Sequence, residues 1–381
     1  MTVTSDVRTT PGGDRSRPSP IGWQLPPFYC PITLTGDIHP RHAELERRAL
    51  EWIDSYGLYP DATERAWGLA THSAEFSCRI IPHGEPEPLL VFMMWNYWAH
   101  AVDDWLDSGS NATATGKVVD TSIRLLRALE YPGSSMMPPS PYTDALHDLV
   151  GRTRAVLSPW QLRRFTDGVR DWLFASSWQT ANAERGVMPS LNDFAAMAVS
   201  INGTRFSLTW GEVANGVDLP PDVQCSPAVQ ALTDAAGFLV GTDNDLFSYA
   251  KEDHLEIPEQ NLINVIAHER GCTPAEALTE AVGLRDRTMT LYLRLRDQLA
   301  ADGDPMMRRY LDTLGDYIAG CIVWQNNAPR FASPRNRNPL PVPGSSFHIT
   351  YRDTPSDPST DAPALPAIAW WWDQLTSPDA P

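Results

Sequence analysis

Apolar residues recur at intervals of three and four positions along most of this 381-residue chain. The segment ERRALEWIDSYG shows the pattern early, EPLLVFMMWNYWAHAVDDWLD repeats it, and PMMRRYLDTLGDYIAGCIVWQNN shows it near the end. Such spacing collects apolar side chains on one face of an α-helix. We therefore predict that helices make up the chain from about Pro40 to Phe331.

Proline and glycine gather between these segments, as in EYPGSSMMPPSP and NGVDLPPDVQCSP, where they would separate one helix from the next. The motif TPAE predicts a helix start, because Thr273 can cap the helix, Pro274 fits its first turn and Glu276 completes a capping box. We find no series of β-branched runs with a period of two and no repeat of solenoid length. The pattern therefore predicts an all-α fold in a single domain.

The two ends of the chain differ in composition from this helical part. Residues 1–27 are rich in Pro, Ser, Gly and Arg, which predicts a disordered arm. Residues 28–331 form the helical domain. Residues 332–381 are Pro-rich again and are expected to be loose, although the three adjacent tryptophans at 370–372 indicate an apolar docking point.

Composition limits the environment and the partners of the protein. Hydrophobic residues make up 42% of the chain, and the formal net charge is −17, which disfavours a nucleic-acid partner. No apolar run approaches the roughly 20 residues that span a bilayer, and the first residues lack the apolar core of a signal peptide. The five cysteines form no CxxC pair, which argues against a zinc site or a disulfide framework. We therefore expect a soluble, cytoplasmic protein with no membrane insertion.

A first acidic cluster, Asp103, Asp104 and Asp107, ends a very apolar predicted helix. On a helix Asp103 and Asp107 lie on one face, one turn apart, so their charges repel unless a cation or water intervenes. Mg²⁺ prefers a few carboxylate oxygens, with waters and phosphate oxygens completing its octahedron. The cluster therefore suggests a magnesium site, although an acidic helix end in solvent would have the same sequence.

A second cluster consists of Asn244, Ser248 and Glu252, at the end of another apolar segment. Their spacing places three oxygen-bearing side chains in one column over two helical turns, where they could hold one hard cation. Taken alone, the column is equally explained as a polar face. Two such helices facing each other would form a metal-lined entrance to an aromatic cavity, which suits a diphosphate head with a hydrocarbon tail.

The segments DDWLD and NDLFSYAKE resemble the aspartate-rich and NSE motifs of bacterial class I terpene synthases. The resemblance spans about 28–331, includes FYCPI, NLINVIAHERGCTPAEAL and WQNNAPRF, and is nearest the branch that contains 2-methylisoborneol synthases. It implies a class I α-helical bundle around a central apolar cavity. It also implies a terpene cyclase, a lyase that ionises a prenyl diphosphate with three Mg²⁺ ions. A homodimer is a further expectation that rests on this analogy alone.

Carried over position by position, the resemblance implies a set of metal ligands and a set of diphosphate contacts. The implied metal-site residues are Asp103, Asp104, Asp107, Asn244, Ser248 and Glu252. Within this set, Asp104 would orient its motif through hydrogen bonds. Arg330 with Phe331 resembles the family's late Arg–Tyr pair, whose arginine donates to the diphosphate, and Lys251 is a further diphosphate contact. Phe331 lacks the hydroxyl group of the usual tyrosine.

One departure from the family concerns the arginine that senses the diphosphate, because its position falls on Ala198. Arg205 is the nearest basic residue and would have to reach back from the neighbouring turn. Asn202 is a polar alternative. Gly203 matches the glycine at the family's helix break, whose carbonyl is thought to help trigger ionisation.

Aromatic faces can stabilise a travelling carbocation by about 0.5–2 kcal/mol each. The candidate pocket residues are Phe76, Trp95, Trp98, Phe206, Trp210, Trp324 and Phe331. Ordinary core packing explains each of them equally well. Trp98 would raise the floor of the pocket, which favours farnesyl diphosphate and leaves geranylgeranyl and 2-methylgeranyl diphosphates as alternatives. His100 and His254 could act as bases, but hydrogen-bonded histidines are the simpler interpretation.

Three other classes of protein share features with this sequence. A chain-elongating prenyltransferase should carry a second aspartate-rich motif where NDLFSYAKE stands, and a class II cyclase needs a DxDD motif that the sequence lacks. A degenerate helical scaffold without ionisation activity is the non-enzyme alternative. The missing arginine at Ala198 favours the scaffold, whereas six ligand-type residues in two motifs argue against it.

Overall fold

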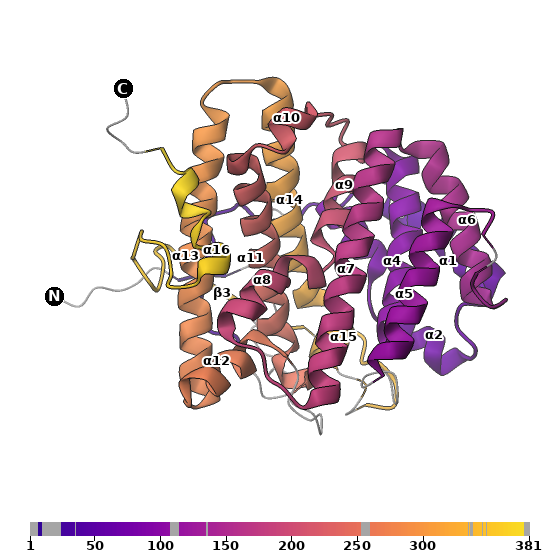
Figure 1. Ribbon diagram of the computed structural model, residues 1–381, viewed down its shortest axis with the longest axis horizontal. Helices are drawn as coiled ribbons and strands as arrows, with labels where there is room; N and C mark the ends of the chain where they lie inside the picture. Colours follow the sequence, from indigo (N-terminus) through magenta and orange to yellow (C-terminus); the bar gives the residue numbers. More distant parts are fainter. Residues whose placement is uncertain are drawn as a thin grey trace.

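The computed structural model describes residues 7–9, 24–34, 36–106, 114–134, 136–252, 260–333, 335, 338–344, 346–347 and 349–376. Helices dominate this part of the chain, which confirms the predicted all-α fold (Figure 1). The helices are α1 (His42–Tyr56), α2 (Ala62–Leu69), α3 (Ser73–Ile80), α4 (Pro86–Leu106), α5 (Thr115–Glu130), α6 (Pro141–Val156), α7 (Pro159–Arg185), α8 (Leu191–Ile201), α9 (Thr204–Ala214), α10 (Pro221–Gln224), α11 (Pro227–Glu252), α12 (Leu262–Arg270), α13 (Pro274–Ala300), α14 (Pro305–Asn327), α15 (Pro329–Ala332) and α16 (Pro366–Ala369).

The longer helices pack side by side into one bundle, in which α11 lies beside both α13 and α14 (Figure 1). The helix α14 also packs on α3, and α4 packs on α1, α3 and α9. The apolar faces predicted from the sequence meet in one contiguous core. Among the described helices, none is long and apolar enough to cross a membrane.

Local sequence signals explain where many of these helices begin. Proline occupies the first turn of α6, α7, α13 and α14, where its missing N–H costs no hydrogen bond and its fixed φ suits the helix. The predicted capping box of α13 is confirmed, because Thr273 Oγ1 accepts from the Glu276 N–H and Glu276 accepts from the Thr273 N–H. Local sequence therefore determines where these four helices begin.

A small sheet joins the two ends of the chain. The strand β3 (Thr350–Arg352) lies between β1 (Val7–Thr9), to which it is antiparallel, and β2 (Phe28–Tyr29), to which it is parallel. Strands of two or three residues with no hydrophobic alternation give no sequence signal of their own. The sequence analysis therefore missed this sheet.

The C-terminal segment 349–376 packs on the bundle, which differs from the expected loose tail. The helix α16 contacts α8, and a 3₁₀ turn η2 (Trp372–Gln374) follows it. Trp371 is only 2% exposed and its ring lies 5.8 Å from that of Phe238 on α11. Burying a large apolar side chain contributes roughly 1.5–3 kcal/mol, so Trp371 and the other buried apolar residues of this segment stabilise its packing together.

A buried ionic network ties both chain ends to the long helices. Arg285 of α13 donates from Nε to Asp243 Oδ1 at 2.7 Å, and its guanidinium also bonds the Tyr29 carbonyl. The adjacent Asp286 accepts from the Tyr29 N–H at 2.8 Å and from the Ser356 hydroxyl at 2.7 Å. All three charged side chains are fully buried. Because Asp243 precedes Asn244, this network also fixes the part of α11 that reaches the site.

Glu75 connects α3 to the end of α14. Its carboxylate accepts from Arg79 Nε at 2.7 Å and from Asn327 Nδ2 at 3.0 Å, and it lies 2.8 Å from His72 Nδ1. Burial raises the pKa of Glu75, but hydrogen bonds from His72, Asn327 and Arg79 outweigh that effect and hold the pKa at about 2. The ionised form of Glu75 therefore stabilises the contact between these helices.

We expect the substitution Glu75→Gln to remove an acid-sensitive part of the folding stability. The folded pKa of about 2 lies below the ordinary value of 4.5, so the stabilisation is complete above pH 4.5 and is lost as the pH falls towards 2. Urea unfolding should show a loss of a few kcal/mol at pH 7 and a smaller difference from the wild type at pH 3. Glu51→Gln, at an exposed acid, is the control. Equal losses at both pH values would contradict this account of Glu75.

Candidate active site

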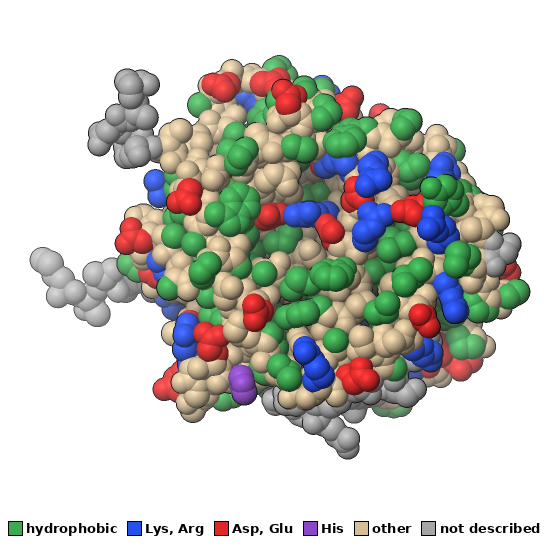
Figure 2. All heavy atoms as spheres, viewed as in Figure 1, with side chains coloured by type: hydrophobic (Ala, Val, Ile, Leu, Met, Phe, Trp, Pro, Cys, Tyr) green, Lys and Arg blue, Asp and Glu red, His purple; other side chains and the backbone are tan. Residues whose placement is uncertain are grey.

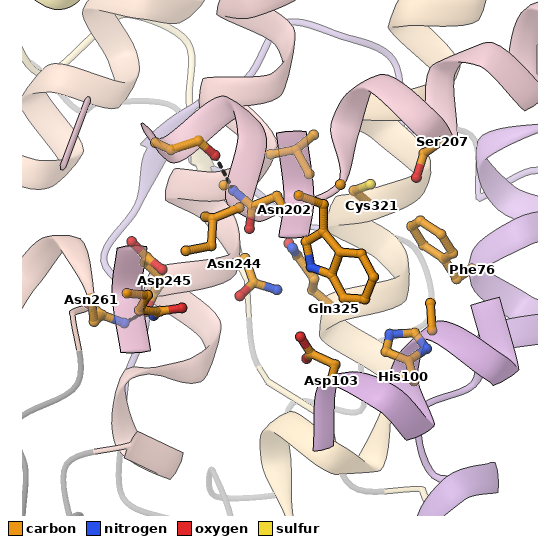
Figure 3. Close-up of a pocket in the computed structure, with 18 of the residues that line it drawn as sticks. Phe76, His100, Asp103, Asn202, Ser207, Asn244, Asp245, Asn261, Cys321 and Gln325 are labelled. Atoms are coloured by element: carbon orange, nitrogen blue, oxygen red, sulfur yellow. Dashed lines mark hydrogen bonds between the residues drawn. The ribbon is translucent and has the colours of Figure 1, made fainter. Parts of the chain in front are cut away.

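A cavity of about 240 Å³ opens into the bundle between α4, α7, α8, α9, α11 and α14 (Figure 3). The residues of α4, α11 and α14 that line it lie in the C-terminal halves of their helices, apart from Asn96 at the middle of α4. Its lining comprises Phe76, Asn96, Ala99, His100, Asp103, Trp172, Trp178, Gln179, Phe194, Met197, Ala198, Ile201, Asn202, Gly203, Phe206, Ser207, Val240, Gly241, Asn244, Asp245, Lys251, Gln260, Asn261, Tyr317, Cys321, Trp324, Gln325, Arg330 and Phe331. Partial negative charge at helix C-termini favours a cation nearby.

The two sequence motifs meet at this cavity through Asp103 of α4 and Asn244 of α11 (Figure 3). Burial raises the pKa of Asp103 to about 6, although the charges of Arg330 and Lys251 act against this rise. A carboxylate that is costly to ionise in the protein alone is stabilised by a cation that binds to it. Asp103 and Asn244 therefore offer carboxylate and amide oxygens suited to a hard cation.

Ser248 lies one turn beyond Asn244 on α11 and is only 1% exposed. Its Oγ has no hydrogen-bond partner within the described part of the chain, and Ser248 does not itself line the cavity. Such an orphaned buried hydroxyl fits a metal ligand, because a bound cation would satisfy it. The side chains of Asp107 and Glu252 lie outside the described residues. No cluster of three or more His, Cys, Asp or Glu occurs among the described side chains, so the group described here mixes carboxylate, amide and hydroxyl oxygens.

Two cationic side chains, Lys251 and Arg330, line the same cavity. The Arg330 guanidinium lies 3.6 Å from Asp104 Oδ1 and 6.0 Å from the centre of the Phe331 ring. Lys251 Nζ is also 6.0 Å from that ring. Asp104 is half exposed and does not line the cavity. The structure therefore brings Arg330 and Lys251 to the cavity that contains Asp103 and Asn244.

His100 lines the cavity one turn before Asp103, and its Nδ1 lies 2.9 Å from Ser73 Oγ. Burial, together with the charge of Arg330, lowers the pKa of His100 to about 3. The imidazole is therefore neutral near neutral pH, and it is hydrogen-bonded as the simpler interpretation expects. His254 lies outside the described residues.

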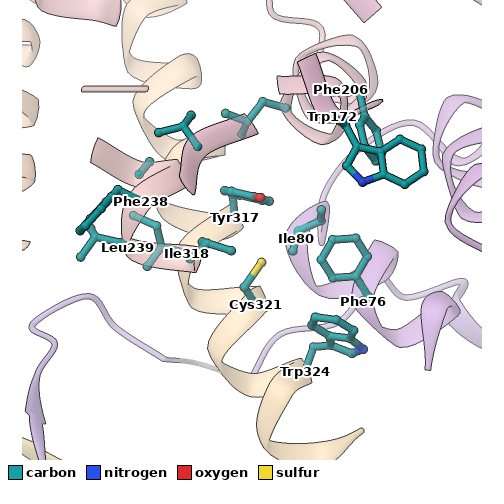
Figure 4. Close-up of a cluster of buried hydrophobic side chains, with 14 of the residues drawn as sticks. Phe76, Ile80, Trp172, Phe206, Phe238, Leu239, Tyr317, Ile318, Cys321 and Trp324 are labelled. Atoms are coloured by element: carbon teal, nitrogen blue, oxygen red, sulfur yellow. The ribbon is translucent and has the colours of Figure 1, made fainter. Parts of the chain in front are cut away.

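Aromatic rings form much of the apolar part of the cavity, and Figure 4 shows how they cluster. Trp324 Nε1 donates to the Thr71 carbonyl at 2.7 Å, which fixes the indole, and its ring lies 4.7 Å from Phe76 and 5.4 Å from Phe331. Phe206 lies 6.2 Å from Trp172. Four predicted pocket residues, Phe76, Phe206, Trp324 and Phe331, therefore line this cavity.

The predicted helix break occurs at Gly203, between α8 and α9, where φ is 62°. The Gly203 carbonyl accepts from the Ser207 N–H at 3.1 Å and starts α9. Asn202 lines the cavity, and its Nδ2 donates to the Ala198 carbonyl at 2.7 Å. The break therefore brings a backbone carbonyl and an amide side chain to the wall that holds Ala198.

We expect Gly203→Ala to destabilise the protein by about 2–5 kcal/mol, because it combines backbone strain with overpacking. An added Cβ would lie 2.1 Å from Phe206 Cε1. The matched control is Gly186→Ala, which has a φ of 63° and open space around its Cβ, and which should cost only about 1–2 kcal/mol. Urea unfolding of both variants measures the difference. Equal losses would show that Phe206 moves away without cost.

Three predicted pocket residues lie elsewhere in the core. Trp95 Nε1 donates to Thr153 Oγ1 at 2.8 Å, and Trp98 Nε1 donates to the Tyr142 carbonyl at 2.9 Å. Both indoles therefore point towards α6, and Trp210 packs with Phe165 and Phe92. None of the three tryptophans lines the described cavity. The argument that Trp98 forms the pocket floor is consequently wrong.

Arg205 does not reach back to the cavity. It forms ion pairs with Asp171 of α7 at 3.1 Å and Asp234 of α11 at 3.3 Å, and it is 44% exposed. Figure 2 shows that acidic and basic side chains lie next to one another on this face of the molecule. Asp171 and Asp234 therefore hold Arg205 outside the cavity lining, and it does not replace the arginine that is missing at Ala198.

Several cavity residues were missed by the sequence analysis. Trp172 and Trp178 of α7 and Phe194 of α8 line the cavity, but each sits in a periodic apolar pattern that says nothing about which cavity it faces. For Gln325 the sequence did contain a signal that could have identified it as a cavity residue. It continues the column of Tyr317 and Cys321 on α14 at four-residue spacing, so a buried amide follows two less polar residues on the same face.

Comparisons with known proteins identify the family and the fold of the chain. Residues 94–290 match the family model described as terpene synthase family 2, C-terminal metal binding. The chain is 32% identical to bonnadiene synthase of Allokutzneria albata over 92% of this chain and 97% of that protein. It is also 32% identical to spiroviolene synthase of Streptomyces violens, over 92% of this chain and 96% of that protein. The crystal structure of the reconstructed ancestral protein SVS_A2 superimposes with a TM-score of 0.80 at 36% identity, over 92% of this chain and 99% of that chain.

Proposed function

The chain belongs to the terpene synthase family and is a terpene cyclase; from that premise we propose that it ionises farnesyl diphosphate with Mg²⁺ and cyclises the carbocation to a sesquiterpene hydrocarbon or alcohol. One observation carries the proposal: Asp103, Asn244 and Arg330 share a cavity with a cluster of aromatic rings. A polar group and an apolar surface in one cavity suit a substrate with a diphosphate head and a hydrocarbon tail.

The proposed metal site uses Asp103, Asn244 and Ser248, with Asp107 and Glu252 as further ligands from the same motifs. The raised pKa of Asp103 and the orphaned Ser248 hydroxyl support this set, since both groups gain from a nearby cation. Bound Mg²⁺ supplies Lewis-acid stabilisation of the leaving diphosphate and a template that orients it. We propose three ions, by analogy with the family motifs.

Arg330 and Lys251 would donate to diphosphate oxygens from the same end of the cavity. The protein has a net charge of −17, so these two cations and the metal ions provide the local positive charge that an anionic head requires. Asp104, 3.6 Å from Arg330, would orient that guanidinium. Asn202 would take the place of the diphosphate-sensing arginine that is missing at Ala198. The Gly203 carbonyl would help to trigger ionisation there.

The aromatic rings would protect and stabilise the carbocation. Phe76, Phe206, Trp324 and Phe331 present apolar surface that excludes water, which would otherwise quench an allylic cation. Each suitably placed ring face contributes on the order of 0.5–2 kcal/mol by cation–π interaction. The neutral His100 adds no competing positive charge.

Geranylgeranyl diphosphate is a second candidate substrate, because the position of Trp98 removes the argument against a longer tail. The preference for a shorter tail depended on Trp98 as the floor of the pocket, but that indole lies outside the cavity and bonds the Tyr142 carbonyl. A longer tail therefore meets no obstacle from this residue.

The test is to incubate the purified protein with Mg²⁺ and, separately, geranyl, 2-methylgeranyl, farnesyl and geranylgeranyl diphosphates. Gas chromatography–mass spectrometry of the extracts should show a cyclic hydrocarbon or alcohol from farnesyl diphosphate, and EDTA should abolish it. A cyclic product from geranylgeranyl diphosphate alone would support the second candidate. If no substrate turns over while metal and diphosphate still bind, the chain is a degenerate scaffold.

A further inference from the structure

Gln325 is the cavity residue whose chemistry the proposed function leaves unexplained. It is 1% exposed, lies near the C-terminal end of α14 and lines the cavity. Within the part of the chain that the structure describes, neither its Nε2 nor its Oε1 has a hydrogen-bond partner. A primary amide carries two donors and one acceptor, and burying them without partners costs free energy.

The surroundings of Gln325 show in which part of the cavity its side chain lies. It follows Tyr317 and Cys321 in one column on α14, and Arg330 comes soon after it in the chain. Figure 3 shows the labelled side chains of Gln325, Asn244 and Asp103 directed into the same space. The unpartnered amide therefore lies with the charged groups of the cavity.

The chemistry of the amide indicates which part of a prenyl diphosphate Gln325 contacts, the head or the tail. Nε2 needs an acceptor and Oε1 needs a donor, and a hydrocarbon tail offers neither. Diphosphate oxygens are acceptors, and water bound to Mg²⁺ is a donor. We infer that Gln325 is a substrate-binding residue whose amide contacts the diphosphate head together with its hydrated metal. This inference rests on the proposed function.

The test uses inorganic pyrophosphate with Mg²⁺ as the probe and calorimetry as the readout. Gln325→Met keeps the length of the side chain and removes its hydrogen bonds, so it should weaken binding about tenfold. Without ligand, the same variant should melt at or above the wild-type temperature, because an unpaired polar group leaves the core. Gln325→Leu serves the same purpose if the methionine variant does not fold.

The control is Gln224→Met, which removes another buried glutamine. Gln224 is outside the cavity lining, and its Nε2 donates to Glu212 at 2.9 Å. This variant should melt at a lower temperature and bind pyrophosphate as tightly as the wild type. The opposite signs of the two melting shifts separate a binding residue from a structural one.

Three results would overturn the inference. If the wild type does not bind pyrophosphate with Mg²⁺, the proposed function fails and the inference with it. If the wild type binds and both Gln325 variants bind equally well, only the role of Gln325 is wrong. If binding is unchanged but an alcohol product is replaced by a hydrocarbon, Gln325 holds a quenching water instead of the diphosphate.

Discussion

Replacing Asn244 by alanine is expected to lower the turnover of the prenyl diphosphate by at least about a hundredfold. Metal-ion stabilisation of a leaving group contributes several kcal/mol, and each 1.4 kcal/mol corresponds to a factor of ten in rate. Asn244 lines the cavity together with Asp103, and the orphaned Ser248 hydroxyl lies one turn further along α11. Steady-state release of pyrophosphate measures the loss, and the Mg²⁺ concentration for half-maximal rate should rise.

The matched control for this substitution is Asn215→Ala. Asn215 ends α9, donates from Nδ2 to Thr313 Oγ1 at 2.9 Å, and does not line the cavity. The Asn215→Ala variant should lose some folding stability and turn over the prenyl diphosphate at the wild-type rate. A full rate in Asn244→Ala, with an unchanged Mg²⁺ requirement, would mean that α11 supplies no metal ligand at this position.

The second large effect concerns stability and the buried Arg285. We expect Arg285→Met to lower the free energy of unfolding by about 3–5 kcal/mol, because it leaves a buried carboxylate without its partner. Arg285 donates to Asp243 from Nε at 2.7 Å and from an Nη at 3.2 Å, and its guanidinium lies 4.3 Å from the Phe28 ring. Unfolding in urea, followed by circular dichroism, measures the change.

Two further variants isolate the ionic part of this effect. The double substitution Arg285→Met with Asp243→Leu should recover part of the loss, since it removes the unpaired Asp243 carboxylate, although Asp286 and the Tyr29 carbonyl still lose the guanidinium. Arg47→Met, which breaks an exposed pair with Glu51, should cost less than about 1 kcal/mol. A double variant as unstable as Arg285→Met would show that packing around the arginine, and not its charge, holds the chain ends.

The helical fold was predictable because its signals are local. Proline in the first turn, the capping box at Thr273 and Glu276, and apolar spacing are all read within a few residues. The helix break at Gly203 was also predictable, from resemblance to the family, and its φ of 62° explains why glycine is needed there. The family resemblance itself is confirmed by the comparisons.

The composition of the cavity was predictable only in part, because it depends on which face each helix presents. The helix α4 is apolar on nearly all sides, so periodicity could not show that Trp95 and Trp98 face α6 while His100 and Asp103 face the cavity. The expectation that Arg205 could reach back to the cavity was wrong for a related reason. Its ion partner Asp234 is close only in the folded bundle.

The packed ends of the chain were unpredictable for another reason. The strands β1, β2 and β3 are two or three residues long, and their pairing joins segments far apart in sequence. Pro-rich composition near the C-terminus indicated a loose segment, while the tryptophans at 370–372 indicated docking. In the structure docking prevails, because Trp371 is buried against α11.

We propose that a metal-bound diphosphate occupies the charged end of the cavity, between Asp103 and Asn244. The most direct test is a crystal structure of the protein with Mn²⁺ and inorganic pyrophosphate, because anomalous scattering locates the manganese ions. We predict manganese bound to Asp103 and Asn244 oxygens, with Arg330 donating to the pyrophosphate. Manganese and pyrophosphate bound elsewhere, with these side chains uncoordinated, would contradict the account.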